Sequence, residues 1–444
     1  MTSGERSFAP KMIGGNPLAI QNTPPPSVTL PFFAASFIGL IACGLELSRA
    51  SSQSVADPTS DPTVAAAHLA MLATLSMGIL GALHQFTPVV TQRKLKSTLL
   101  ARATFISWLL GSWLLPIGFA SGYEIFVEAG GAFAGITIAL LTINLWSSLS
   151  VKGKGAPVIG LRFALAGFIA TGCFGVIYVS DRTGNWFALN GHTLLAHATI
   201  GIFAWLGLTY ISVSEKLWPM FFLAHLPKKS NSGLMAVFLV PAGIILLSPG
   251  LLLSIPIAAV CGAVIVGMGL AFHLRSQFLH LKNRKRKIDI YLIQVVVASI
   301  WLGVGTIFAA VSAITIRSNY NQAIVLAAAS ITCFTGWILQ AYVAHIHKVI
   351  PFILWSTNRK HGITKNPNGG QLVFEDFYSR NLALAGSILI NLGLIAGVVG
   401  FSTRAHLVLA ISGLLLSVAG ISLIVNFTFK PLQIYRYSKS QSTS

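Results

Sequence analysis

Residues 68–90 read HLAMLATLSMGILGALHQFTPVV, a nearly uninterrupted apolar run with a histidine at its start, His68, and a proline near its end, Pro88. About 20 apolar residues in an α-helix span the roughly 30 Å hydrocarbon core of a bilayer. The apolar residues are continuous rather than alternating, so the run predicts a transmembrane helix, which satisfies its own backbone hydrogen bonds, and not a barrel strand.

Similar runs recur along the whole chain. Of its 444 residues 54% are hydrophobic and only 9% are charged, which leaves too little polar surface for a water-soluble globule. We therefore predict an all-α membrane protein with twelve transmembrane helices. The predicted spans are residues 29–49, 64–90, 98–120, 125–149, 158–180, 191–214, 233–253, 254–276, 289–316, 321–352, 377–401 and 405–428.

The net charge of +19 does not indicate a nucleic-acid-binding protein, because the basic residues gather in alternate loops. Loops assigned to one face hold most of them, and the opposite loops hold only Arg49, Arg182, Arg317 and Arg404. The positive-inside rule then places both termini in the cytoplasm and the chain in an inner, cytoplasmic-type membrane. The densest run, Lys282–Lys287, has two interpretations: a topology anchor, which this rule favours, and a docking site for an acidic partner or anionic lipid.

An internal repeat is the most informative feature. The second, sixth and tenth runs end alike, and their prolines, Pro88, Pro219 and Pro351, are 131 and 132 residues apart. Each interval contains four spans and four loops. We predict three four-helix units at residues 29–149, 158–276 and 289–428, preceded by a cytoplasmic segment, 1–28, and followed by a tail, 429–444.

A resemblance to a known family depends on the twelve spans, on the span at 68–90 and on the span that contains His197, Gly201, Gly207 and Tyr210. In these features the chain resembles the catalytic subunits of heme–copper oxidases and nitric-oxide reductases. It is most similar to their short, degenerate NnrS-like relatives. The resemblance implies that His68 ligates a heme and that His197 is a copper ligand. The family's second heme ligand on the tenth span is missing, so two alternatives stay open: a five-coordinate heme on His68, or a heme with His192 or His197 as its second ligand.

The family's remaining ligands have no counterpart here. Its histidine pair in the seventh span is absent from residues 233–253, and its His-x-His in the tenth span falls on Ala329 and Ile331. A binuclear oxygen-reducing centre requires these ligands. We therefore expect a heme or metal protein of sensing, electron transfer or metal handling that reduces neither oxygen nor nitric oxide.

A second set of polar residues lies four positions before each proline: His84, Glu215 and His347, with His345 beside them. If the three units are equivalent, these side chains share one depth in the membrane, where ionisable groups are costly. Three alternatives are open: a site for a divalent metal (copper, iron or zinc), a hydrogen-bonded or proton-relay network, or interfacial side chains that do not meet. The histidines at 273, 280, 361 and 406 are expected to be solvated.

Two other functions remain open. Intramembrane Glu128 and Glu215, with the histidines, suit a proton-coupled transporter or channel. Alternatively, the chain is a structural subunit of a membrane complex. The expected partners are membrane lipids, other membrane subunits or a redox partner, and not nucleic acid.

Overall fold

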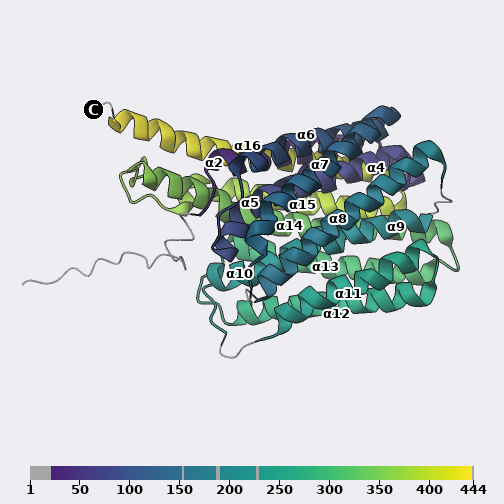
Figure 1. The fold of residues 1–444 in the computed structure, drawn as a ribbon. Helices are drawn as coiled ribbons and strands as arrows, with labels where there is room; N and C mark the ends of the chain where they lie inside the picture. The colour runs from purple at the N-terminus through teal and green to yellow at the C-terminus, as the bar shows by residue number, and fades with distance from the viewer. Residues whose placement is uncertain (1–21, 153–154, 187–190, 227–229, 443–444) are drawn as a thin grey trace, which may run out of the picture.

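The computed structural model describes residues 22–152, 155–186, 191–226 and 230–442, and in these residues the chain is almost entirely helical. Twelve helices are long and apolar enough to cross a membrane, as predicted. Figure 1 shows them lying side by side in one bundle. The predicted segment 1–28 lies mostly outside the described residues.

Ten of the spans are each a single helix. The single-helix spans are α2 (Pro26–Arg49), α6 (Thr98–Ser121), α7 (Glu124–Leu149), α8 (Gly155–Gly184), α11 (Ser232–Leu252), α12 (Pro256–Lys282), α13 (Ile290–Thr315), α14 (Tyr320–Lys360), α15 (Arg380–Thr403) and α16 (His406–Ser442). Helices α14 and α16 run past their predicted ends at 352 and 428. The predicted break between the seventh and eighth spans is confirmed, since Ser254 has a left-handed φ of 55° and α12 begins at Pro256.

The two remaining spans each contain a π-helical segment. The second span is α4 (Asp61–His68), η1 (Leu69–Ser76) and α5 (Met77–Thr91), and the sixth is α9 (Gly191–Thr199), η2 (Ile200–Gly207) and α10 (Leu208–Phe221). Both π segments have eight residues. Each ends twelve residues before the proline of its span.

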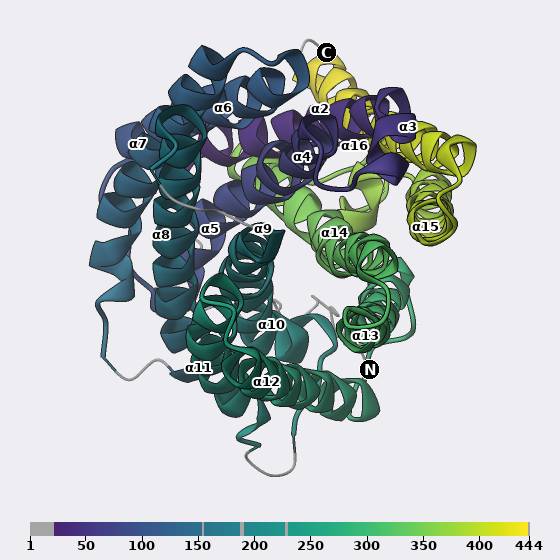
Figure 2. The ribbon, with the colours of Figure 1, turned by 90° about the vertical axis from the view of Figure 1, so that its right-hand side faces the viewer.

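Neighbouring spans pack as antiparallel hairpins, and the first span closes the arrangement against the last. Helix α2 contacts α16 along its length. A β-carbon at Gly44 of α2 would lie 2.2 Å from the carbonyl oxygen of Gly413 in α16, so the two backbones touch. Viewed end on in Figure 2, α5, α10 and α14 lie toward the middle, and the other spans surround them.

Aromatic side chains join the three inner spans. The Trp205 indole N–H donates to the hydroxyl of Ser76, the last residue of η1, at 2.9 Å. The Trp337 ring of α14 packs on Gly207, the last residue of η2, where a β-carbon would lie 3.0 Å from it. Tyr342 of α14 packs on Gly78 of α5. Trp205 of the sixth span and Trp337 of the tenth span thus each contact the last residue of the π segment in the preceding inner span.

Candidate functional site

The structure brings His68 and His197 together between the second and sixth spans. Their ring centroids are 6.4 Å apart and their planes differ by 22°. His68 directly precedes η1, and His197 lies three residues before η2. Short π segments are costly relative to α-helix and are often found at functional sites, so the two π segments mark this pair as the leading candidate site.

Hydrogen bonding leaves ring nitrogens free for a ligand. The Nδ1–H of His68 donates to the backbone carbonyl of Val64 at 2.8 Å, which leaves the lone pair on Nε2. A metal-binding histidine typically donates its other nitrogen to a carbonyl in this way. The Nδ1 atom of His197 is buried and has no hydrogen-bond partner among the described residues. Both rings therefore retain a nitrogen able to bind a metal centre.

Aromatic rings and an ion-pair network enclose the pair. Phe119 stacks on His68 with centroids 5.4 Å apart, and Phe174 lies 5.7 Å from His197. The Arg182 guanidinium lies 5.3 Å above the Phe119 ring. The same guanidinium binds two carboxylates, at 2.6 Å from Asp61 and 2.7 Å from Glu124. These bonds join α4, α7 and α8 at this end of the bundle.

The sequence alone does not indicate this ion-pair network. Arg182 contributes only to the charge pattern of the loops, and Asp61 and Glu124 lie far apart in the chain. The predicted alternative, His192, is half-buried and lies five residues before His197. At about 100° per residue, its side chain leaves α9 about 140° away from that of His197.

The predicted His84, Glu215 and His347 cluster is not assembled in this structure. His84 stacks on Phe32 of α2 with centroids 5.5 Å apart, and Glu215 lies against Gly233 of α11. His347 faces Tyr378 and α16. The described residues contain no group of three or more His, Cys, Asp or Glu side chains placed to hold a metal ion. A shared metal at these positions stays a prediction of the sequence.

His345 belongs instead to a buried polar cluster centred on Tyr210. The Tyr291 hydroxyl and His345 Nε2 are 3.2 Å apart. The Tyr210 ring meets His345, with centroids 5.7 Å apart, and His273, with centroids 5.3 Å apart. The Tyr210 hydroxyl and both His273 nitrogens are buried without a hydrogen-bond partner among the described residues.

The structure corrects the prediction that four histidines are solvated. His361 and His406 are exposed, as expected. His273 is 0% exposed and His280 is 4% exposed. Both lie on α12, which continues to Lys282. The predicted span ends at residue 276, so it includes His273 but not His280. Seven residues, about two helical turns, separate the two, so both face inward.

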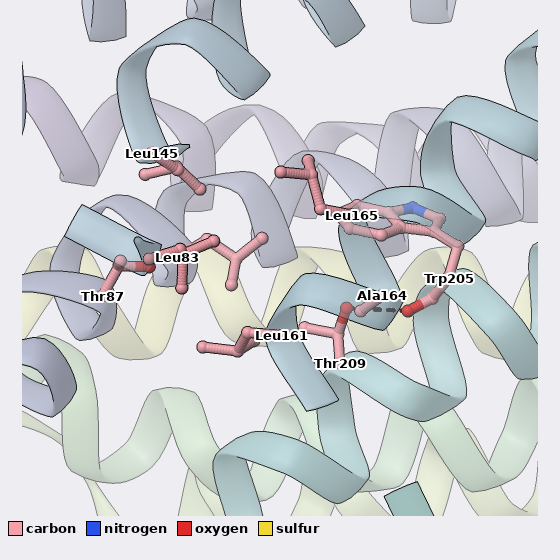
Figure 3. Close-up of a pocket in the computed structure, with 9 residues that line it drawn as sticks. Leu83, Thr87, Leu145, Leu161, Ala164, Leu165, Trp205 and Thr209 are labelled. Carbon is pink, nitrogen blue, oxygen red and sulfur yellow. Dashed lines mark hydrogen bonds between the residues drawn. The ribbon is translucent and has the colours of Figure 1, made fainter. Parts of the chain in front are cut away.

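A small internal cavity lies beside the histidine pair's helices but is not a ligand site. Figure 3 shows it between Leu83, Leu145, Leu161 and Trp205, and its volume is about 10 Å³. A site for a single water needs at least about this volume and two or more polar partners. The lining is almost wholly apolar, and Thr209 already donates to the Trp205 carbonyl at 2.7 Å.

Neither the protein-family models nor the curated proteins with which the sequence was compared give a match. The functional argument therefore depends on the chain's own residues.

Proposed function

We propose that this chain is a degenerate relative of the heme–copper oxidase and nitric-oxide reductase superfamily that binds heme through His68 and His197. Its function in this proposal is electron transfer or sensing within the membrane, without reduction of oxygen. One observation carries the proposal: His68 and His197 come from two different spans, and their ring centroids are 6.4 Å apart.

The proposal includes three repeated four-helix units with both termini in the cytoplasm. The two π segments support the repeat, since each ends twelve residues before a proline. The contacts of Trp205 with Ser76 and of Trp337 with Gly207 support it further, because corresponding residues meet. The excess of basic loops on one face supports the orientation and the assignment to an inner membrane.

The donor set fits heme better than a bare metal ion. A protein-bound copper, iron or zinc ion usually takes three or four side-chain ligands. No third histidine, cysteine or carboxylate joins His68 and His197 among the described residues. Heme supplies four ligands of its own and needs only one or two axial side chains. Two histidines therefore complete a heme site and leave an ion site incomplete.

The surrounding residues have separate tasks in this proposal. The Val64 carbonyl holds His68 in the tautomer with a free Nε2. Phe119 and Phe174 keep water from the rings, and Arg182 covers Phe119 from the end of the bundle. A heme bound there would supply one-electron redox chemistry.

The test is the absorption spectrum and the heme and metal content of the purified protein, with His68→Gln and His197→Gln variants. Glutamine keeps much of the side-chain volume and does not replace an axial imidazole. We expect a Soret band in the wild type that is lost or strongly shifted in both variants. The matched control is His84→Gln, because His84 also donates Nδ1–H to a carbonyl four residues earlier. Absence of heme from the wild type, or a Soret band unchanged in both variants, would refute the proposal.

Proton-coupled transport is the second candidate, and the polar cluster favours it. A series of neighbouring polar side chains, joined partly by ring contacts, leads inward from one end of the bundle. Asp289 binds Lys348 at 2.8 Å, and the Lys348 ammonium lies 5.7 Å from the centre of the Tyr291 ring. Tyr291 reaches His345, and His345 reaches Tyr210. Exposed Glu128 is not part of this series.

Proton flux into proteoliposomes that contain a pH-sensitive dye tests this candidate. If the series carries protons, His345→Gln should reduce the flux by at least tenfold. His347→Gln is a matched control, since His347 is two residues away on α14 and donates Nδ1–H in the same way to the Val343 carbonyl. Equal flux in the two variants and the wild type would exclude this path. If the protein shows neither heme nor flux, the structural-subunit interpretation is favoured.

A further inference from the structure

A groove with a volume of about 230 Å³ opens where α13 and α15 begin. Its lining residues are Arg286, Ile288, Asp289, Ile290, Glu375, Tyr378 and Arg380. It lies at the end of the basic run Lys282–Lys287, which the proposed heme site leaves without a role.

Ion pairs hold one wall of the groove in place. Arg286 binds Asp289 at 3.1 Å and Glu375 at 3.5 Å, and Asp289 also binds Lys348 at 2.8 Å. Burial alone would raise the pKa of Asp289, but the Lys348 and Arg286 charges and hydrogen bonds from Lys348 and the Leu292 amide hold it below its usual value. The two carboxylates are therefore already neutralised by cations.

Arg380 and Tyr378 provide hydrogen-bond donors that these pairs do not use. Arg380 is exposed and forms no ion pair among the described residues. Tyr378 is 8% exposed, and its hydroxyl has no hydrogen-bond partner in the described part of the chain. Burial, with the charges of Glu375 and Asp289, raises the pKa of Tyr378 to about 12, so its hydroxyl remains a donor. The groove and its ion pairs include three positive side chains, Arg286, Lys348 and Arg380, and two negative ones, Asp289 and Glu375. Their net charge is therefore +1.

The surroundings increase the positive potential. Helices α13 and α15 both begin at the groove, with Asp289 and Ser379 as their N-caps, and a helix N-terminus attracts anions. The basic run is held in position, because the backbone amides of Lys285 and Arg286 donate to the Phe222 carbonyl at 3.2 and 3.3 Å. Arg284, Lys285 and Lys287, the neighbours of Arg286 in the chain, are exposed.

We propose that this groove binds the phosphate of an anionic membrane lipid, with Arg380 and Tyr378 as the principal donors. The helices that form it are membrane spans that begin here, so the groove lies at the level of the lipid headgroups. Ile288 lines the groove and is 62% exposed, which gives an acyl chain an apolar surface next to the charged pocket. Basic pockets between spans at this level are typical sites for anionic lipids.

The test measures lipid retention by native mass spectrometry and thermal stability in mixed micelles of detergent with phosphatidylglycerol or phosphatidylcholine. We expect selective retention of phosphatidylglycerol. Arg380→Gln should weaken retention about fivefold to tenfold, and adding Tyr378→Phe should weaken it further. The matched control is Arg359→Gln, which removes one charge at the same end of the bundle but outside the groove.

Three results would overturn the proposal. The first is equal retention of the two lipids. The second is an equal loss in the Arg359→Gln and Arg380→Gln variants, which would indicate diffuse attraction to the whole basic face. The third is stabilisation by inorganic phosphate that matches stabilisation by phosphatidylglycerol, which would assign the groove to a free anion.

Discussion

Replacing Gly78 by alanine should destabilise the contact between α5 and α14. A β-carbon at position 78 would lie 2.4 Å from two carbons of the Tyr342 ring and 2.5 Å from its hydroxyl oxygen, far inside the usual 3.5–4.0 Å separation of carbon atoms. The ring is 7% exposed, and its hydroxyl lies 2.5 Å from that of Ser36 in α2, so it must move and lose this hydrogen bond. Overpacking costs about 1–3 kcal/mol and the hydrogen bond about 1 kcal/mol, against a gain of up to about 1 kcal/mol from alanine's helix propensity. We expect a net loss of about 1–3 kcal/mol.

Unfolding of the detergent-solubilised protein by heat or by sodium dodecyl sulfate, followed by tryptophan fluorescence, measures this loss. Gly267→Ala on α12 is the matched control, because nothing lies within 4 Å of a β-carbon there. The control should leave stability unchanged or raise it by up to about 1 kcal/mol. If Gly78→Ala is as stable as Gly267→Ala, the inner spans do not pack as described.

Three further predictions concern single interactions. In a double-mutant cycle, Ser76→Ala and Trp205→Phe should show a coupling of about 0.5–1.5 kcal/mol, as for other hydrogen bonds between membrane helices; no coupling in SDS unfolding would contradict the hydrogen bond. Asp289→Asn leaves the buried Lys348 unpaired and should cost about 1–3 kcal/mol at pH 7. Because the folded-state pKa of Asp289 is depressed, this difference should be constant above the unfolded-state pKa of about 4 and shrink as the pH falls from there through the lower folded-state pKa; a difference that does not shrink at any acid pH at which the protein stays folded would refute the ion pair. Arg182→Gln should cost about 1 kcal/mol at low salt and less in 1 M NaCl; an equal loss at both ionic strengths would show that packing, and not charge, is responsible.

The positions of the twelve spans could be predicted because they depend on composition alone. Each span must bury its backbone polar groups within the membrane, so length and hydropathy determine where it begins and ends. The prediction was less accurate where a helix continues beyond the apolar run. Helix α12 extends to Lys282, and this extension includes His280, while His273 lies within the predicted span; both are buried, although they were predicted to be solvated.

The direction in which each side chain faces could not be predicted in the same way. At 100° per residue, the sixteen positions from His68 to His84 correspond to a rotation of about 160°. In the structure the eight residues of η1 lie between them, and a π segment contains more residues per turn than an α-helix. The two histidines do face different neighbours, Phe119 and Phe32, but the regular-helix calculation does not describe the chain that joins them.

The distribution of π segments among the inner spans connects this geometry to the proposed site. In the second and sixth spans, which carry His68 and His197, a π segment begins one and three residues after the histidine, respectively. The tenth span, α14, is α-helical from Tyr320 to Lys360. An irregular segment forms weaker hydrogen bonds than an α-helix of the same length, so packing alone would favour its removal. Among the described residues, π segments occur only in the two spans that carry His68 and His197, so the proposed site accounts for turns that packing alone would not favour.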